Sequence, residues 1–355
     1  MTDDAYFPDD LDGFLARFQG FHVWPGIVDL HGDGFERHLA PRRGALRDLR
    51  QGFWALDAEL AACGITTAYL AQFWSWEGGM RGPDFARRMV ATLAELRGTL
   101  RTDMRVQLRV ETSLLDQFDD ILELVVTYGI DYVVLNDHLP HDALARGKRP
   151  PRLTGQALKS GRSPEAHLAL LQDLHARRDD VPEAVAAFVA SLTAHGVRVG
   201  SHDDARAVDR RWFADTGANI AEFPMTAEAV EEACAATSPV ILGAPNIVRG
   251  GSHGDGLTAR DHVLAGQCDA LVSDYHYPAL ANAAQSLAQD MGEDAAWSLI
   301  SSDPARVMGL ADRGVLAPGD RADLVVLSPD YRVVGTMVAG RWSFIAGALA
   351  DHLGV

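Results

Sequence analysis

Eight short apolar segments alternate with longer helical segments along the chain, and this alternation constrains the fold more than any other feature. Strand followed by helix, repeated, predicts βα units and a parallel sheet. Several of the segments are continuous apolar runs, as strands buried on both faces should be. Eight is the number of strands in a closed barrel, so the sequence predicts an α/β fold with a (β/α)8 TIM-like barrel. The predicted strands are 27–31, 65–71, 105–111, 132–136, 197–202, 219–223, 240–243 and 270–274.

The length of 355 residues suits a barrel of about 250 residues with a small appendage. We expect the barrel domain to span 24–312. The tail, 313–355, carries turn residues between short β-prone runs, and we expect it to form a small, reduced β-structured subdomain together with 1–23. The Arg-, Lys- and Pro-rich stretch 139–180 follows a strand, so it is interpreted as a lid or substrate loop, with a disordered insertion as the alternative.

The net charge of −17 excludes most nucleic-acid-binding proteins, because no Lys/Arg-rich tract offsets it. An anionic small-molecule substrate would need a local basic pocket. No apolar run reaches the ~18 residues of a membrane helix, and the acidic start does not resemble a signal peptide. The three cysteines are odd in number and far apart, as is typical of a reducing compartment. These features predict a cytoplasmic protein that does not contact membranes. They leave open whether the chain forms a homo-oligomer.

Five of the predicted strands end in side chains that can bind a metal. His31 and Asp33 are two apart, so both point the same way from an extended backbone. Carboxylates gathered at one barrel mouth would repel one another without a cation. The sequence therefore predicts one or two divalent metal ions, with zinc expected and manganese or iron as alternatives. The predicted ligands are His31, Asp33, Glu111, His138, His202 and Asp274.

Metal-assisted hydrolysis is the leading hypothesis for the reaction. Asp274 is the predicted general base, with His253 or Asp204 next in line, although Asp204 is interpreted first as a helix N-cap. The longer side chain of Glu111 is expected to span two cations. The glycine-flanked turn around Arg249 suits a phosphate-binding site, and a flexible loop with a solvated arginine is the alternative interpretation. The residues expected to bind substrate are Arg249, Ser252 and His253 in this turn, with Arg37 and His38 after the first strand.

Several motifs resemble those of the amidohydrolase superfamily: "PGIVDLH", "GITTA" and "DPARVMGLADRGVLAPGDRADLVVL". Within it, "DLHGDGFERHLAPR", "HDD", "EFPMT" and "GAPNIVRGGSH" are similar to the PhnM family of α-D-ribose 1-methylphosphonate 5-triphosphate diphosphatases. The resemblance covers roughly 24–341 and implies a one- or two-metal hydrolase that releases diphosphate from a phosphoanhydride, with Glu111 in place of the bridging carboxylated lysine of many relatives. Two alternatives stay open: hydrolysis or deamination at a C–N bond on the same metal site, and a metal-binding barrel without turnover.

Two departures from the family pattern bear on the structure. Only about 23 residues precede the predicted barrel, so the small β subdomain must be reduced. The predicted metal ligands follow strands one, three, four, five and eight, whereas the superfamily usually uses strands one, four, five, six and eight. Either a strand lies undetected between Tyr69 and Arg105, or the placement is a variant.

Overall fold

The computed structural model describes residues 5–40, 48–250 and 258–354. The chain divides into two compact units. Unit 1 comprises 1–70, 95–105 and 239–355, and unit 2 comprises 71–94 and 106–238. None of the helices among the described residues is long and apolar enough to cross a membrane.

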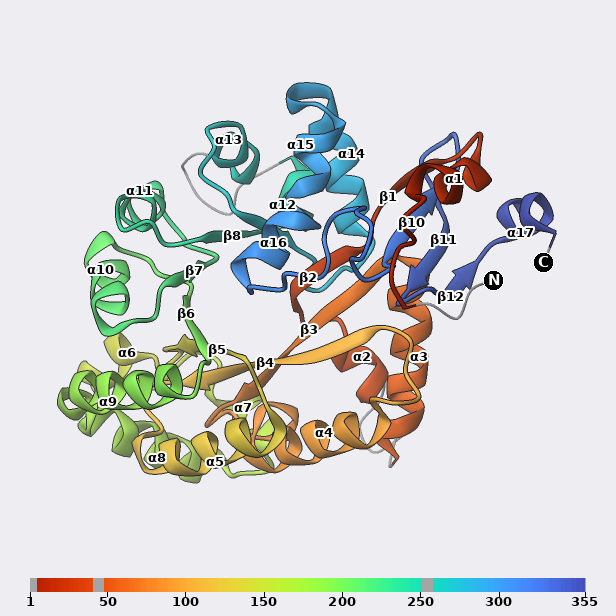
Figure 1. Ribbon diagram of the computed structural model, residues 1–355. Coiled ribbons are helices and arrows are strands. Elements are labelled where there is room, and N and C mark those ends of the chain that lie inside the picture. The colour runs from red at the N-terminus through yellow and green to blue at the C-terminus, as the bar shows by residue number, and fades with distance from the viewer. Residues whose placement is uncertain (1–4, 41–47, 251–257, 355) are drawn as a thin grey trace. The chain divides into compact units, whose positions relative to one another are not determined.

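Eight parallel strands follow one another in chain order in a single sheet, and every predicted strand is found. A bridge between Gly32 and Asp274 joins the first strand of the sheet to the segment after the last. The α/β fold of the (β/α)8 class is therefore confirmed. The strands are β2 (Ile27–Gly32), β3 (Ile65–Trp74), β4 (Asp103–Glu111), β5 (Tyr132–Asn136), β6 (Arg198–His202), β7 (Ile220–Glu222), β8 (Val240–Gly243) and β9 (Ala270–Val272) (Figure 1).

Burial and capping explain where these elements form and end. Every residue of β2, β3 and β5 is buried, which fits the continuous apolar runs of the sequence. Gly129 ends α5 in the left-handed conformation at φ 63°, a conformation that glycine adopts without steric cost. Ser163 caps α8 by accepting a hydrogen bond from Ala166 N, and Pro164 occupies its first turn.

Helices flank the strands in both units. Unit 1 contains α1 (Leu11–Leu15), α2 (Glu36–Leu39), α3 (Leu49–Ala62), α12 (Ala244–Arg249), α13 (Ala259–Leu264), α14 (Ala279–Met291), α15 (Glu293–Ser298), α16 (Ser302–Val307), α17 (Gly347–Leu353) and the 3-10 turn η1 (Ala16–Phe18). Unit 2 contains most of α4 (Pro83–Leu96), α5 (Phe118–Tyr128), α6 (His141–Ala145), α7 (Leu153–Ser160), α8 (Pro164–Ala176), α9 (Val181–Ala194), α10 (Ala207–Thr216) and α11 (Ala227–Ala235), with 3-10 turns η2 (Gly79–Arg81), η3 (Leu115–Gln117) and η4 (Arg178–Asp180).

A separate antiparallel sheet joins the two ends of the chain within unit 1. Its strands are β1 (His22–Pro25), β10 (Leu324–Leu327), β11 (Val333–Val338) and β12 (Arg341–Ile345), in that order. The red and blue strands of Figure 1 show this arrangement. Phe7, Phe18, Val326 and Leu349 belong to its buried core. The predicted reduced β subdomain is confirmed, although α1 and η1 supply more of the N-terminal contribution than strand does.

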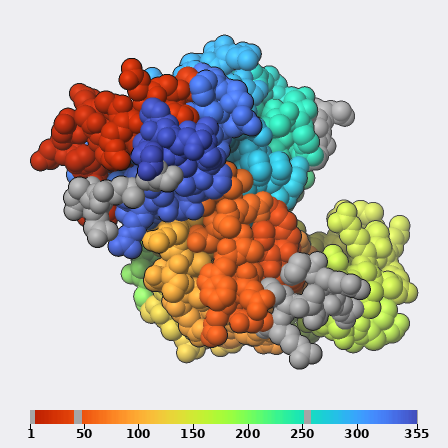
Figure 2. Space-filling view, turned by 90° about the vertical axis from the view of Figure 1, so that its right-hand side faces the viewer, coloured from red at the N-terminus to blue at the C-terminus, as the bar shows by residue number. Residues whose placement is uncertain are grey.

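The Arg-, Lys- and Pro-rich segment 139–180 is helical, because α6, α7 and α8 lie within it. Leu153, Ala157 and Leu171 are fully or almost fully buried, so these helices have an apolar face that packs. The alternative of a disordered insertion is therefore wrong. Figure 2 shows the surface of this segment in yellow-green. We refer to helices α6–α8 as the inserted helices.

Candidate functional site

Unit 1 brings together three of the predicted metal ligands. One ligand atom each of His31, Asp33 and Asp274 lies within 4.8 Å of the other two. His31 is the next-to-last residue of the buried strand β2 and is only 1% exposed. An imidazole and two carboxylates are donors that zinc, manganese and iron accept. The donor chemistry of this group therefore fits a divalent cation.

Backbone contacts fix the position of this group. Asp274 N donates to His31 O at 2.9 Å, and Asp33 N donates to Asp274 O at 2.9 Å. The buried carboxylate of Asp29 accepts hydrogen bonds from His31 N and from both the N and Oγ of Ser273. Burial raises the pKa of Asp29, although these donors favour its charged form. The two chain segments that carry the group are therefore joined directly beside it.

Gly32, between His31 and Asp33, lets the backbone pack closely against Tyr277 and Asp29. A Cβ at this position would lie 2.7 Å from Cε1 of Tyr277 and 3.0 Å from Oδ2 of Asp29. Such distances are shorter than van der Waals contact, so a side chain would displace the ring or the carboxylate. The glycine in "DLHGDG" is thus required by the packing around the group.

In unit 2, Glu111 and His138 are bonded to each other. Glu111 is fully buried at the end of β4. Its Oε1 lies 2.6 Å from Nδ1 of His138, and its Oε2 accepts the backbone N–H of His138 at 3.0 Å. Burial disfavours charge on His138, but the hydrogen bond and the negative charge of Glu111 outweigh it and raise the pKa of that imidazole.

His202 is the centre of a second cluster in unit 2. Its ligand atoms lie within 4.8 Å of those of His138 and Asp203. The guanidinium of Arg109 lies 3.0 Å from Nε2 of His202, donates a hydrogen bond to Asn136 Oδ1 at 3.2 Å, and stacks over the Phe73 ring at 4.0 Å. Burial and, after it, the positive charge of Arg109 lower the pKa of His202 to about 4. His202 is therefore neutral at pH 7, the state in which an imidazole binds metals.

The sequence prediction missed Glu222. This residue ends β7, the sixth strand, and is fully buried. Its Oε1 accepts hydrogen bonds from Gln107 at 2.6 Å and Tyr132 at 3.4 Å, and its Oε2 lies 3.8 Å from Nε2 of His202. The rule that selected the other strand-end residues would have found it, because "AEF" ends the predicted strand 219–223.

Three residues just after strand ends have positive φ angles: Asp203 (62°), Phe223 (51°) and Asp274 (55°). This backbone region is uncommon for residues other than glycine, and it is an outlier for phenylalanine. Such conformations concentrate at active sites, where the surrounding structure holds them. The strained turns thus coincide with the ends of β6, β7 and β9, where the candidate groups lie.

The predicted substrate-binding residues have varied surroundings. Arg37 and His38 both form ion pairs with Glu59, and Arg37 also donates to Tyr275 O at 3.1 Å. Arg249 ends α12, donates to Asn246 Oδ1 at 2.8 Å and stacks over the Tyr275 ring at 5.9 Å. Ser252 and His253 lie outside the described residues.

The expectation that Asp204 caps a helix is wrong. The N-cap of α10 is Arg206, which makes no side-chain cap hydrogen bond. Asp204 instead forms a buried ion pair with Arg210 at 3.1 Å and accepts a hydrogen bond from Ser201 at 2.5 Å. A buried guanidinium needs such partners, so Asp204 stabilises the β6–α10 connection.

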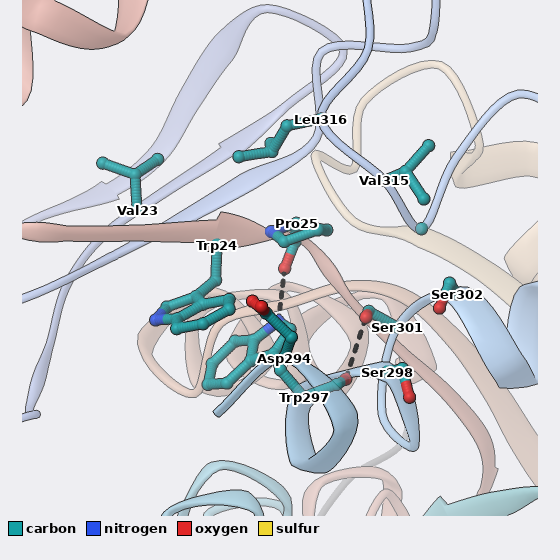
Figure 3. A pocket seen from close by; sticks show the side chains of 11 residues that line it. Val23, Trp24, Pro25, Asp294, Trp297, Ser298, Ser301, Ser302, Val315 and Leu316 are labelled. Carbon is teal, nitrogen blue, oxygen red and sulfur yellow. Dashed lines mark hydrogen bonds between the residues drawn. The ribbon is translucent and has the colours of Figure 1, made fainter. Parts of the chain in front are cut away.

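A cavity of about 360 Å³ in unit 1 lies at the end of β1, and none of the candidate metal ligands lines it. The stacked rings of Trp24 and Trp297 line it, with Ser298, Ser301 and Leu316 (Figure 3). In the close-up, Trp297 donates its indole N–H to Pro25 O at 3.0 Å. The cavity borders β1, whereas His31 lies near the end of β2, so the cavity is separate from the unit 1 group.

Comparison with known proteins gives a consistent family. The amidohydrolase family model matches residues 259–343. The α-D-ribose 1-methylphosphonate 5-triphosphate diphosphatase of Escherichia coli K12 is 32% identical over 335 residues, which cover 90% of this chain and 85% of that protein. The chain belongs to the amidohydrolase family. The similarity to the diphosphatase extends over most of both chains.

Solved amidohydrolase-type structures share the fold. N-Acetyl-D-glucosamine-6-phosphate deacetylase from Mycobacterium smegmatis gives a TM-score of 0.54 at 18% identity, covering 91% of this chain and 87% of that chain. A β-aspartyl dipeptidase from Fervidobacterium islandicum gives a TM-score of 0.57 at 14% identity, covering 93% and 86%. These similarities show the fold alone.

This amidohydrolase is a hydrolase, and the family generally uses divalent metal ions. No strand lies between β3 and β4 in the fully described stretch 48–250, so the alternative of an undetected strand is wrong. The candidate groups follow the first, third, fourth, fifth and eighth strands of the sheet, and Glu222 adds the sixth.

Proposed function

We propose that this hydrolase cleaves a phosphoanhydride bond of a ribosyl phosphonate triphosphate and releases diphosphate. The observation that carries the proposal is the 32% identity to the Escherichia coli diphosphatase over 90% of the chain. The cluster of His31, Asp33 and Asp274 supports a metal-dependent reaction. One or two divalent ions, zinc first, with manganese or iron as alternatives, suit the imidazole and carboxylate donors.

In this proposal His31, Asp33 and Asp274 hold the cation in unit 1, and His138 and His202 are the imidazole donors of unit 2. A bound divalent ion supplies an acidified water and polarises the phosphoryl oxygen. Asp274 accepts the proton of the attacking water as general base and returns a proton to the leaving diphosphate. Glu111 stays a proposed metal ligand of unit 2, and its buried carboxylate also fixes the ring of His138 through Nδ1.

The anionic substrate requires cationic groups near the reaction. Arg249 is the proposed phosphate contact in unit 1, since its side chain stacks over Tyr275, next to Asp274. Ser252 and His253, which follow it in the sequence, stay predicted substrate contacts outside the described residues. Arg37 and His38 would act together with Glu59, which neutralises part of their charge.

A second candidate is hydrolysis at a C–N bond. The observation that favours it is the pairing of both Arg37 and His38 with Glu59, because this pairing reduces the positive charge available to a triphosphate. A neutral amide substrate needs no such charge, and the same metal chemistry would serve it.

The test combines metal analysis with a substrate panel. We expect one to two equivalents of transition metal in the purified protein, and loss of most of the metal bound by unit 1 in the His31→Ala/Asp33→Ala variant. The matched control is Asp351→Ala/His352→Ala, which removes the same residue types from the exposed end of α17. Full metal content in the first variant would place the site elsewhere.

Diphosphate release should be measured on sugar and nucleoside triphosphates and compared with hydrolysis of N-acyl amino acids, cyclic amides and aminopurines. Release of diphosphate by the wild-type protein, lost in the first variant and kept in the control, supports the proposal. Turnover only of the C–N substrates would establish the second candidate instead.

A further inference from the structure

We propose that Trp76 is a positioning residue for the metal-binding imidazole of His138, and that the inserted helices hold Trp76 in place. This inference rests on the proposed function, because it assumes that His138 binds a metal. It adds a connection within unit 2 from the inserted helices, through Trp76 and Glu111, to His138.

The first link is between Trp76 and Glu111. The indole Nε1–H of Trp76 donates to Oε2 of Glu111 at 3.3 Å, and Trp76 is only 2% exposed. Together with the two bonds to His138, this contact gives the buried carboxylate three donors. A carboxylate held from both sides cannot rotate freely.

The second link is between Glu111 and His138. When the ring of His138 is neutral, Oε1 of Glu111 accepts its Nδ1–H and the lone pair lies on Nε2. A metal-binding histidine is commonly oriented in this way by a carboxylate, and loss of such a partner costs about 10–100-fold in metal affinity. Trp76 thus acts on the ring through Glu111.

The third link joins Trp76 to the inserted helices. Arg162, between α7 and α8, donates to the backbone oxygen of Trp76 at 2.8 Å. The buried ring of His167, on α8, lies 5.9 Å from the Trp76 ring and 3.4 Å from Nη1 of Arg162. Both the backbone and the ring of Trp76 therefore contact the inserted segment.

Two glycines bring the loop after Trp76 against α7. A Cβ on Gly78 would lie 2.9 Å from Cβ of Ser160, and one on Gly79 would lie 2.8 Å from Lys159 O. Both glycines have positive φ angles, 71° and 60°. The close approach needs glycine on both counts. The contact between the loop and the inserted helices is therefore built into the sequence "WEGGM".

The test is the zinc affinity of Trp76→Phe, measured by competition with a chelator of known affinity on the full chain. Phenylalanine fills most of the ring volume but has no N–H. We therefore expect the zinc dissociation constant of the site that contains His138 to rise by ~10-fold. Arg162→Met should weaken binding less, by ~2- to 10-fold, because Arg162 acts on Glu111 only through Trp76.

The matched control is Trp74→Phe. Trp74 is fully buried two residues earlier, and its indole donates to Gln117 Oε1 at 2.7 Å instead of to Glu111. It should lower the Tm of the metal-free protein as Trp76→Phe does, yet leave zinc affinity unchanged. Equal zinc affinity of wild type and Trp76→Phe, or equal losses in both variants, would overturn the inference.

A double-mutant cycle with Glu111→Gln separates positioning from general loosening. If Trp76 acts through Glu111, Trp76→Phe should add little to the loss already caused by Glu111→Gln. Full additivity would contradict the proposed connection. Absence of any stoichiometric zinc, manganese or iron from the wild-type protein would remove the proposed function and this inference together. If the wild-type protein binds metal and the Trp76→Phe variant binds it equally well, only the inference is removed.

Discussion

The two units hold their candidate metal-binding groups in different ways. In unit 1, backbone hydrogen bonds between His31, Asp33 and Asp274 fix the group, and Asp29 joins the neighbouring backbone. In unit 2, side chains hold one another: Glu111 bonds to His138, and Arg109 bonds to His202. Unit 1 therefore positions its group through the fold, and unit 2 through a side-chain network.

This difference predicts how each group responds to substitution. A side chain positioned by its own backbone can be changed chemically while its neighbours stay in place. In a network, removal of one member alters the orientation of the next. Substitutions in unit 1 should thus mainly change kcat, and substitutions in unit 2 should mainly change metal affinity.

The largest expected effect is that of Asp274→Asn. Asparagine keeps the shape and part of the ligand capacity of aspartate but cannot accept the proton. We expect kcat to fall by ~10²- to 10⁴-fold while most of the metal is retained. Glu111→Gln is the partner experiment from unit 2, and it should weaken metal affinity while kcat at saturating metal falls far less.

Steady-state kinetics with metal analysis measures both variants. The comparison between the units breaks down if Asp274→Asn stays nearly as active as wild type, or if Glu111→Gln retains full metal affinity and loses kcat. The first result would assign the general base to another group, and the second would give Glu111 a role in the chemical step.

Arg249→Ala should have an intermediate effect. The guanidinium is the proposed contact to an anionic group, and a charged hydrogen bond is worth ~1.5–3 kcal/mol, so kcat/KM should fall by ~10- to 100-fold. Metal content and Tm should be unchanged. Arg306→Ala is the control, since Arg306 is an exposed arginine of unit 1 paired with Asp303. An unchanged kcat/KM would limit Arg249 to its packing on Tyr275.

The smallest effect concerns stability and its dependence on pH. Burial raises the pKa of Asp323 to about 6, so the native state keeps this proton in a pH range where the unfolded state, with a pKa near 3.9, has lost it. Stability should therefore fall as the pH rises from about 4 to about 6. Asp323→Asn should remove this part of the slope.

Denaturant unfolding at several pH values tests this expectation, with Asp351→Asn on the exposed end of α17 as the control. A slope unchanged by Asp323→Asn would assign the pH dependence to other groups. This experiment sharpens the comparison between the units, because it separates pH effects on folding from those on the Asp274 group.

Local sequence patterns were sufficient to predict the strands and the β-structured appendage. A parallel strand buried on both faces needs a continuous apolar run, and the next helix needs its own periodicity, so each βα unit is encoded within a few tens of residues. His31 and Asp33 could be grouped for the same reason, since their spacing alone aligns them. The domain boundary at 24–312 stays a prediction.

The inserted helices show where local reasoning was insufficient. Their Arg, Lys and Pro content resembled that of a loop, but Leu153, Ala157 and Leu171 form a buried face that appears only once the helices pack. Asp204 was misassigned because its partner, Arg210, is buried by the fold rather than marked by the sequence.

The sequence by itself determined which residue types stand at the strand ends: imidazoles and carboxylates after the first, third, fourth, fifth, sixth and eighth strands. Only the tertiary structure decided which of them bond to each other. Asp29 reaches Ser273 across 244 positions, and Trp76 reaches Glu111 across 35. Hydrogen bonds depend on distances of about 3 Å and on direction, and no local pattern records which distant segment will supply the partner.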